Sequence, residues 1–309
     1  MPLDPRAKRL LAMMAAAAPA ERRRPTTSER RQSLAKLMQF ARSDVAGVTA
    51  NDGTLPGPGG DIAYRLYAPR HDRAPVPGFV FFHGGGMVAG SIETHDQVAA
   101  ALADATGCRL ISVDYRLAPE HKFPAAVEDA IAATDFIARN APAFGIDAER
   151  LVVGGDSAGA TLAAVVCQHA LRHGPAIVAQ CLICPVLDFE DASPSREAFA
   201  DNHLIDRLTI EADLADYLPE GADPADIRIS PLRALHVAGL PTAIIHTAEF
   251  DPVRDEGNAY ARKLLAAGVT VEHICHDGMI HNFHAMSAVL PQARLILSQI
   301  GEQVRRAVA

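Results

Sequence analysis

Apolar residues gather in short continuous runs, which alternate with helical stretches from about residue 60 onward. Continuous apolar runs are typical of strands buried on both faces of a sheet. Such strands are predicted at 62–68, 78–83, 109–115, 151–155, 179–186, 241–250 and 270–276. Three- and four-residue apolar spacing, or high alanine content, predicts helices at about 124–140, 158–173 and 291–308. This alternation indicates an α/β fold with a mostly parallel central sheet flanked by helices.

Two polar segments, residues 1–50 and 188–234, interrupt the alternation. Both contain helical pieces, and the second is too long for a simple connecting loop. We therefore expect an N-terminal cap segment (1–50) and a cap insertion (188–234) that together cover a site. Residues 51–187 and 235–309 would form the first and second parts of one core.

Composition and charge exclude several classes of protein. Of the 309 residues, 49% are hydrophobic and 21% are charged, which excludes disordered and fibrous architectures. The net charge is −8, and no basic stripe is interleaved with aromatic residues, so we expect no nucleic-acid partner. No apolar run reaches the roughly 18 residues that a membrane helix needs, so we expect no membrane span.

The N-terminal segment combines basic residues between Lys8 and Arg31 with an alanine-rich run that ends at residue 20. Basic residues ahead of a short apolar run resemble an export signal. The run is only weakly apolar and follows Asp4, so a helix of the cap is favoured and an export signal is the alternative. A solvated helix face is favoured over membrane or phosphate contact for the basic residues.

The five cysteines are an odd number distributed through apolar segments: Cys108, Cys167, Cys181, Cys184 and Cys275. This favours reduced, buried thiols in a reducing compartment, so we expect a cytoplasmic protein. Cys181 and Cys184 form a C-x-x-C within the predicted strand 179–186. An odd offset places them on opposite faces of a strand, so neither a redox pair nor a metal pair is expected.

The sequence Gly155-Asp156-Ser157-Ala158-Gly159 lies between a buried strand and an alanine-rich helix. In this context G-x-S-x-G is typical of a sharp strand-to-helix turn that exposes a serine nucleophile. Glycines are needed there because strand and helix come close together. A turn that merely packs or binds a phosphate is the alternative. We predict that Ser157 is a nucleophile at the positive end of the following helix.

A second glycine cluster, His83-Gly84-Gly85-Gly86, follows the predicted strand 78–83. Successive glycines leave backbone N–H groups bare, as an oxyanion hole requires, and a tight turn without chemistry is the alternative. Both clusters follow strands of a parallel sheet, so they are expected at the same edge. His83 is expected to support the loop rather than to act in catalysis.

Its position along the chain favours Asp251 as the catalytic acid. Asp251 directly follows the predicted strand 241–250, whereas Glu249 precedes the end of the strand and Asp255 lies one helical turn later. A solvated or helix-capping aspartate is the alternative for Asp251. A buried carboxylate at this position would hold an imidazole in the correct tautomer.

Thirteen histidines compete for the role of base. His281 follows the last predicted strand through a short loop and completes the chain order Ser, Asp, His. Its rivals are His276 and His284. His273 and His276 would lie on opposite faces of one strand, so no metal site is expected among these histidines.

Together these motifs resemble the α/β-hydrolases of the hormone-sensitive-lipase-like family, which are largely bacterial carboxylesterases. The resemblance covers nearly the whole chain, in the family's order. It comprises HGGG at 83–86, DYRLAPEHKFPAA at 114–126, GDSAG at 155–159, DPVRDE at 251–256 and HNF at 281–283. It implies the α/β-hydrolase fold with a helical cap built from the two polar segments.

The resemblance further implies the site. It makes Ser157 the nucleophile, Asp251 the acid and His281 the base. The N–H groups of Gly84, Gly85 and Ala158 would form the oxyanion hole, and His83, Gly86 and Asp156 would support the motifs. Asn282 stands where the family often has glycine, which puts the shape of the nearby pocket in doubt.

The implied activity is that of a serine carboxylesterase acting on small short-to-medium acyl esters, without cofactor or metal. An amidase or lactonase would use the same triad, and a non-catalytic receptor is a further alternative that the retention of His281 disfavours. A homodimer through the strand near 270–276 is expected from the family. The cap residues expected to restrict the pocket are Phe199, Leu204 and Leu208.

Overall fold

The computed structural model describes residues 2–17, 23–70, 75–190 and 192–309. Residues 18–20 of the alanine-rich run and Arg22 of the basic stretch lie outside the described residues. The strands are β1 (Val48–Gly57), β2 (Gly60–Pro69), β3 (Val76–Phe82), β4 (Arg109–Val113), β5 (Ile146–Asp156), β6 (Ala179–Ile183), β7 (Thr242–Phe250) and β8 (Val271–Ile280). The α-helices are α1 (Pro5–Ala17), α2 (Thr27–Ala41), α3 (Ile92–Thr106), α4 (Ala125–Arg139), α5 (Ala141–Phe144), α6 (Ala158–His173), α7 (Pro194–Ala198), α8 (Arg207–Tyr217), α9 (Arg254–Ala266) and α10 (Gln292–Ala307). Two 3₁₀ turns are η1 (Pro231–Arg233) and η2 (Phe283–Ala285).

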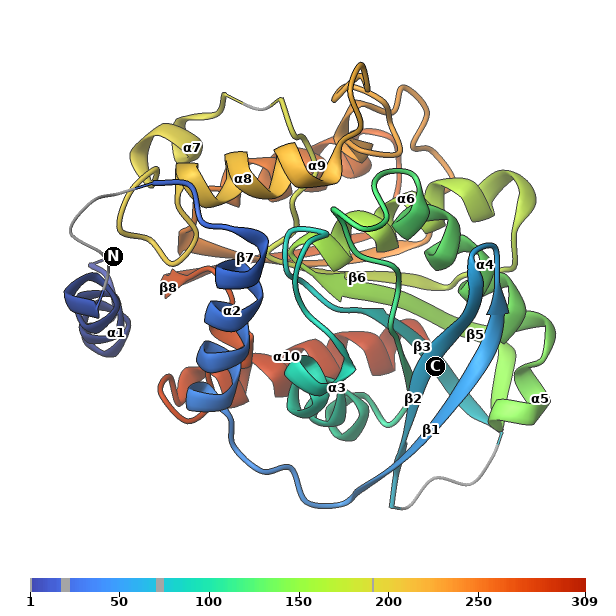
Figure 1. Cartoon of the computed structure of the whole chain (residues 1–309). Helices are drawn as coiled ribbons and strands as arrows, with labels where there is room; N and C mark the ends of the chain where they lie inside the picture. Colours follow the sequence, from blue (N-terminus) through green and yellow to red (C-terminus); the bar gives the residue numbers. More distant parts are fainter. Residues whose placement is uncertain (1, 18–22, 71–74, 191) are drawn as a thin grey trace.

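These strands form one sheet in the order β1-β2-β4-β3-β5-β6-β7-β8 (Figure 1). β2 is antiparallel to both β1 and β4, and all the remaining neighbours are parallel. The predicted mostly parallel sheet is therefore confirmed. Because parallel strands end at the same edge, the segments that follow β3, β5, β7 and β8 come together there.

The apolar pattern misses β1, which begins inside the predicted cap segment 1–50. Leu55 is the only fully buried residue of this strand, because β1 lies at the edge of the sheet. A strand so exposed has no continuous apolar run for a sequence pattern to reveal. The helical part of the N-terminal segment ends at Ala41.

Helices cover both faces of the sheet (Figure 1). α3 and α10 pack on one face, and α4, α6 and α9 pack on the other. Side chains of β3 alternate between the two cores: Phe79 and Phe81 face α3 and α10, whereas Val80 and Phe82 join the core with α4 and α6. Within the described residues, no helix combines the length and the apolar character needed to cross a membrane.

The N-terminal segment and the insertion meet through α2 and α8. Arg30 of α2 forms a bidentate ion pair with Asp213 of α8, with Nη2 2.9 Å from Oδ2. Arg24 and Thr27 bond to two other carboxylates of α8. The expectation of a solvated basic face is therefore wrong for Arg30, whose ion pair with Asp213 is largely buried, whereas Arg24 stays exposed beside Glu211.

Two strand ends differ from the sequence prediction. β8 continues to Ile280, which pairs with Phe250 beyond an irregularity in β7, so His281 follows the strand directly instead of a loop. β6 ends at Ile183, and Cys184 has a left-handed φ of 46°. Cys184 therefore lies outside the strand in which the sequence pattern placed it.

Candidate active site

Ser157 occupies a sharp turn between β5 and α6. Its backbone has φ 52° and ψ −119°, a conformation that non-glycine residues adopt at a cost of about 1–3 kcal/mol. A side chain on Gly155 or on Gly159 would collide with the carbonyl oxygen of Phe82 in the neighbouring β3. The two glycines thus permit the close approach of helix and strand that holds the turn, as predicted.

Three buried side chains form a continuous hydrogen-bonded chain at the edge of the sheet. His281 Nε2 lies 3.0 Å from Ser157 Oγ, and His281 Nδ1 lies 2.7 Å from Asp251 Oδ2. Asp251 follows β7 and His281 follows β8, so three parallel strands deliver the three groups. The structure therefore brings together the predicted nucleophile, base and acid.

The bonding partners determine where the proton of the imidazole lies. A carboxylate only accepts hydrogen bonds, so His281 Nδ1–H donates to Asp251 and Nε2 is left to accept the Ser157 hydroxyl proton. The second oxygen of Asp251 accepts the Val253 N–H at 3.0 Å. This arrangement can deprotonate the serine hydroxyl as it attacks a carbonyl.

Comparison with known proteins identifies the family over most of the chain. Residues 79–285 match the family described as the α/β hydrolase fold. The chain belongs to the α/β-hydrolase family. Its motifs place it in the hormone-sensitive-lipase-like group, so the resemblance inferred from the sequence is confirmed.

Similar α/β-hydrolases carry esterase names. The carboxylic ester hydrolase LipN of Mycobacterium tuberculosis is 42% identical over 243 residues, which span 76% of this chain but only 64% of LipN, just under two-thirds. The carboxylesterase NlhH of the same organism is 42% identical over 238 residues, covering 75% of this chain and 74% of NlhH. The solved structure of a hyperthermophilic esterase from the archaeon Pyrobaculum calidifontis is 37% identical, with a TM-score of 0.93 and full coverage of both chains.

The glycine loop of this α/β-hydrolase, residues His83–Gly86, requires a correction. The N–H of Gly84 donates to Asp156 Oδ1 at 3.0 Å, so it is not available to an oxyanion. Among the described residues, the N–H groups of Gly85, Gly86 and Ala158 donate to no protein acceptor. Gly86, Ser157 and Ala158 line one pocket, whereas neither Gly84 nor Gly85 is among the residues that line it. The free donors are thus shifted by one residue from the predicted pair Gly84 and Gly85.

His83 is bonded to the glycine loop that it begins. Its Nδ1–H donates to the Gly84 carbonyl at 2.9 Å, and its ring stacks on those of Tyr115 and His95. Burial, followed by the nearby His95, lowers the pKa of His83 to about 3. The His83 ring beside the loop is therefore neutral.

The rival acids and bases have other partners. Glu249 accepts the Gly278 N–H, and Asp255 accepts the Ser195 N–H. His276 bonds to His246 at 2.7 Å, whereas His273 lies 3.2 Å from Thr247 Oγ1. His246 and Thr247 are consecutive in β7, so the two histidines do lie on opposite faces of β8, as predicted.

Asn282 takes the place of the family's glycine without altering the backbone that glycine favours. It has φ 58°, in the left-handed region, where asparagine is among the best-tolerated non-glycine residues. The turn that follows His281 is thereby retained.

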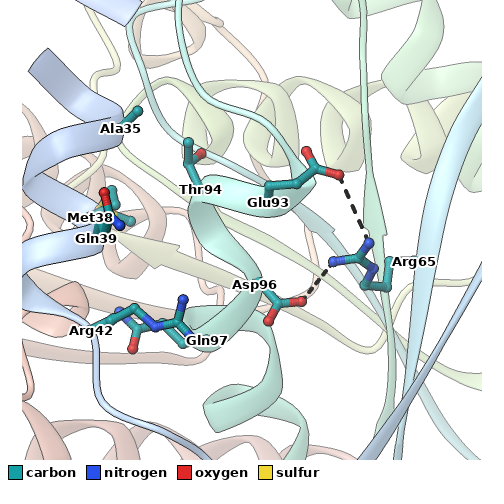
Figure 2. Close-up of a pocket in the computed structure, with 9 residues that line it drawn as sticks. All are labelled: Ala35, Met38, Gln39, Arg42, Arg65, Glu93, Thr94, Asp96 and Gln97. Atoms are coloured by element: carbon teal, nitrogen blue, oxygen red, sulfur yellow. Dashed lines mark hydrogen bonds and ion pairs between the residues drawn. The ribbon is translucent and has the colours of Figure 1, made fainter. Parts of the chain in front are cut away.

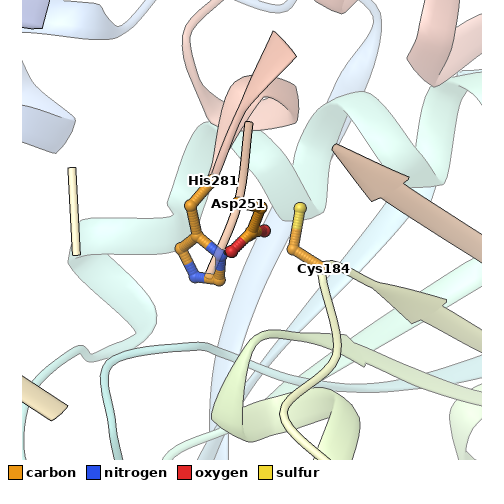
Figure 3. Close-up of side chains that lie close together, drawn as sticks. All are labelled: Cys184, Asp251 and His281. Carbon is orange, nitrogen blue, oxygen red and sulfur yellow. Dashed lines mark hydrogen bonds and ion pairs between the residues drawn. The ribbon is translucent and has the colours of Figure 1, made fainter. Parts of the chain in front are cut away.

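Cys184 lies beside the acid, a position that the sequence pattern did not reveal (Figure 3). Donor atoms of Cys184, Asp251 and His281 all lie within 4.8 Å of one another, close enough for a metal ion. Burial, followed by the charge of Asp251, holds the pKa of the Cys184 thiol well above its usual value, which disfavours the thiolate that binds metals. Asp251 and His281 already bond to each other. The prediction of a metal-free site stays a prediction.

The pocket beside Ser157 is small and mixed in character. Val186, Phe189, Ile205, Ile210 and Val253 supply apolar walls. Arg30 with Asp213, and Arg196 with Glu256, place ion-paired side chains around them. The bulky residues expected to restrict this pocket do not line it: Phe199 packs on Phe250, and neither Leu204 nor Leu208 borders the pocket.

A separate hollow lies between α2 and α3 (Figure 2). Its wall contains Arg65, which forms ion pairs with Asp96, Glu93 and, outside the hollow, Asp52. None of the triad residues borders it. The positive and negative side chains of this hollow neutralise one another, and none of these charged groups is a nucleophile.

Proposed function

We propose that this α/β-hydrolase is a serine carboxylesterase that hydrolyses small short-to-medium acyl esters. The carrying observation is the continuous hydrogen-bonded chain from Ser157 through His281 to Asp251, which opens on a pocket with free backbone donors. The esterase names of similar proteins support this reaction class.

Acylation begins when Ser157 Oγ attacks the ester carbonyl and transfers its proton to His281 Nε2. The Asp251 carboxylate stabilises the resulting imidazolium. The carbonyl oxygen becomes an oxyanion, which the N–H groups of Gly85, Gly86 and Ala158 stabilise. His281 then protonates the departing alcohol, leaving the acyl group on Ser157.

Deacylation repeats these steps with water. His281 takes a proton from the water molecule as it attacks the acyl-enzyme, and the same N–H groups bind the second oxyanion. Return of the proton to Ser157 Oγ releases the acid. No cofactor enters either half of the reaction.

We assign the cap to segments within residues 1–47 and 188–234, with the core formed by 48–187 and 235–309, because the expected boundary at residue 50 falls inside β1. The ion pair between Arg30 and Asp213 joins the two cap segments beside the pocket. Apolar walls at Phe189 and Ile210 leave limited room, which favours short acyl chains.

The test is hydrolysis of p-nitrophenyl esters with acyl chains from two to about sixteen carbons. We expect activity to peak at short chains and Ser157→Ala to lose at least about 10³-fold in kcat, since the nucleophile is removed. Ser112→Ala is the matched control, because Ser112 is equally buried but lies in β4. Full activity of a folded Ser157→Ala protein would refute the assignment.

Amide and lactone hydrolysis would use the same residues. A matched ester and amide with the same acyl group separates an esterase from an amidase, and a lactone series tests the third activity. Binding without turnover of any of these compounds would instead favour a receptor.

The cysteines and the edge strand bear on the compartment and the oligomeric state. All five cysteines are free, which favours the cytoplasm. β8 is an edge strand, which favours a homodimer through its outer side, although Asp4 N–H already binds the Gly278 carbonyl there. A monomer mass in solution would contradict the dimer.

A further inference from the structure

Asp156, the residue before the nucleophile, is buried with two histidines beside its carboxylate. Its Oδ1 accepts the Gly84 N–H, while Oδ2 lies 3.5 Å from His95 Nε2 and 3.6 Å from His284 Nε2. Burial raises the pKa of Asp156, but the two histidines outweigh burial and hold this pKa well below its usual value. A charged carboxylate therefore lies directly behind the glycine loop.

His284 belongs to none of the motifs and forms no hydrogen bond or ion pair with Ser157, Asp251 or His281. It is buried, and among the described residues neither ring nitrogen makes a hydrogen bond, but Nε2 lies at ion-pair distance from Asp156 Oδ2. A buried polar group without a partner destabilises a fold, so a position that served packing alone would favour an apolar side chain. Because Nε2 lies 3.6 Å from Asp156 Oδ2, the polar contact of this histidine is with the Asp156 carboxylate.

We propose that His284 is a positioning residue for the glycine loop. With His95, it holds the Asp156 carboxylate against the Gly84 N–H. That bond fixes the first peptide of the loop, and the N–H groups of the next two residues are then presented to the oxyanion. The inference rests on the proposed esterase function.

The physical effect falls on the transition state. Backbone donors stabilise an oxyanion only where they point at the position that the negative charge will occupy. A displaced loop loses this stabilisation while the walls of the substrate pocket remain unchanged. The expected signature is a lower kcat with an unchanged KM.

The first variant is His284→Leu, which retains an apolar volume but removes the N–H. We expect kcat for p-nitrophenyl acetate to fall about tenfold with KM within about twofold. This loss is smaller than the 10²- to 10³-fold effect of deleting one oxyanion donor, because the donors are displaced rather than removed. His284→Gln places an amide nitrogen at a reach similar to that of Nε2, and it should restore most of kcat.

A double-mutant cycle tests whether His284 acts through Asp156. On an Asp156→Asn background, we expect His284→Leu to change kcat by less than about twofold, because the charge that it positions has been removed. Independent, multiplicative losses in the double variant would overturn the proposal.

The matched control is His246→Leu. His246 is equally buried and bonds to His276 and Gln303, but it does not contact Asp156. We expect its kcat to stay within about twofold of the parent, and thermal unfolding would verify that every variant is folded. Should His284→Leu fail to fold, His284→Met takes its place as a more adaptable apolar side chain.

The outcomes separate the two proposals. Unchanged kcat in the folded apolar variant of His284, or equal losses in that variant and in His246→Leu, would overturn the positioning role alone. Retained activity in Ser157→Ala would instead overturn the esterase mechanism on which that role depends.

Discussion

Replacing Asp251 with asparagine isolates the contribution of the carboxylate, because the two side chains have the same shape. Asp251 Oδ2 accepts His281 Nδ1–H at 2.7 Å, and Oδ1 accepts the Val253 N–H at 3.0 Å. In Asp251→Asn the amide oxygen can keep the Val253 bond, which turns the NH₂ group toward Nδ1. The imidazole must then carry its proton on Nε2, where it can no longer accept the proton of Ser157.

The size of the decrease in kcat distinguishes two explanations of how Asp251 contributes to catalysis. A wrong tautomer disables the base, and we expect kcat to fall by about 10⁴, or about 5 kcal/mol at 1.36 kcal/mol per factor of ten. Loss of one charge-assisted hydrogen bond without a change of tautomer would amount to about 1.5–3 kcal/mol, which is only about 10- to 150-fold.

The assay is steady-state hydrolysis of p-nitrophenyl acetate by the parent protein and by Asp251→Asn, with circular dichroism to verify folding. Asp255→Asn is the matched control, because Asp255 bonds to Ser195 and Arg254 near the same strand end without contacting His281. We expect this control to keep most of the parent kcat. A loss below about tenfold in a folded Asp251→Asn protein would show that Asp251 is not the acid of the triad.

Two further predictions concern stability. Gly159→Ala places a methyl group against the carbonyl oxygen of Phe82, so we expect urea unfolding to show a loss of about 1–3 kcal/mol, and unchanged stability would contradict the close packing of α6 on β3. Burial raises the pKa of Asp213 from 3.8 to about 6 despite Arg30, so below about pH 6 the folded protein holds a proton on Asp213 more tightly than the unfolded chain does. The stabilisation from this group is therefore present at pH 4 and is lost as the pH rises to about 6, by up to about 3 kcal/mol. Unfolding free energies of the parent and Asp213→Asn at pH 4, 5, 6 and 7 should show the parent losing this amount relative to the variant, and a constant difference would refute the burial argument.

The triad could be predicted from sequence because each member is marked by its immediate surroundings. Ser157 lies between a continuous apolar run and an alanine-rich helix, and Asp251 directly follows another run. Strand ends of a parallel sheet converge, so these local signals also carried the expectation that the groups would meet. The boundary before His281 was wrong by four residues, yet its role did not depend on whether a loop or a strand led to it.

Features that depend on contacts between distant loops could not be predicted in this way. The sequence shows three glycines, but only the fold reveals that the Asp156 carboxylate binds Gly84 and leaves Gly85 and Gly86 free. β1 escaped detection because an exposed edge strand needs few apolar residues. The pairing of Arg30 with Asp213 likewise joins residues 183 positions apart.

Sequence alone thus determined the strands from β2 to β8, the helices α4, α6 and α10, the nucleophilic turn and the chain order of the triad, since backbone geometry and burial impose these patterns on neighbouring residues. Tertiary structure alone decided which N–H groups are free, which side chains line the pocket and which two histidines lie beside Asp156. These features depend on contacts at the sheet edge between side chains that are far apart in the sequence. A local pattern of apolar and polar residues does not indicate such contacts.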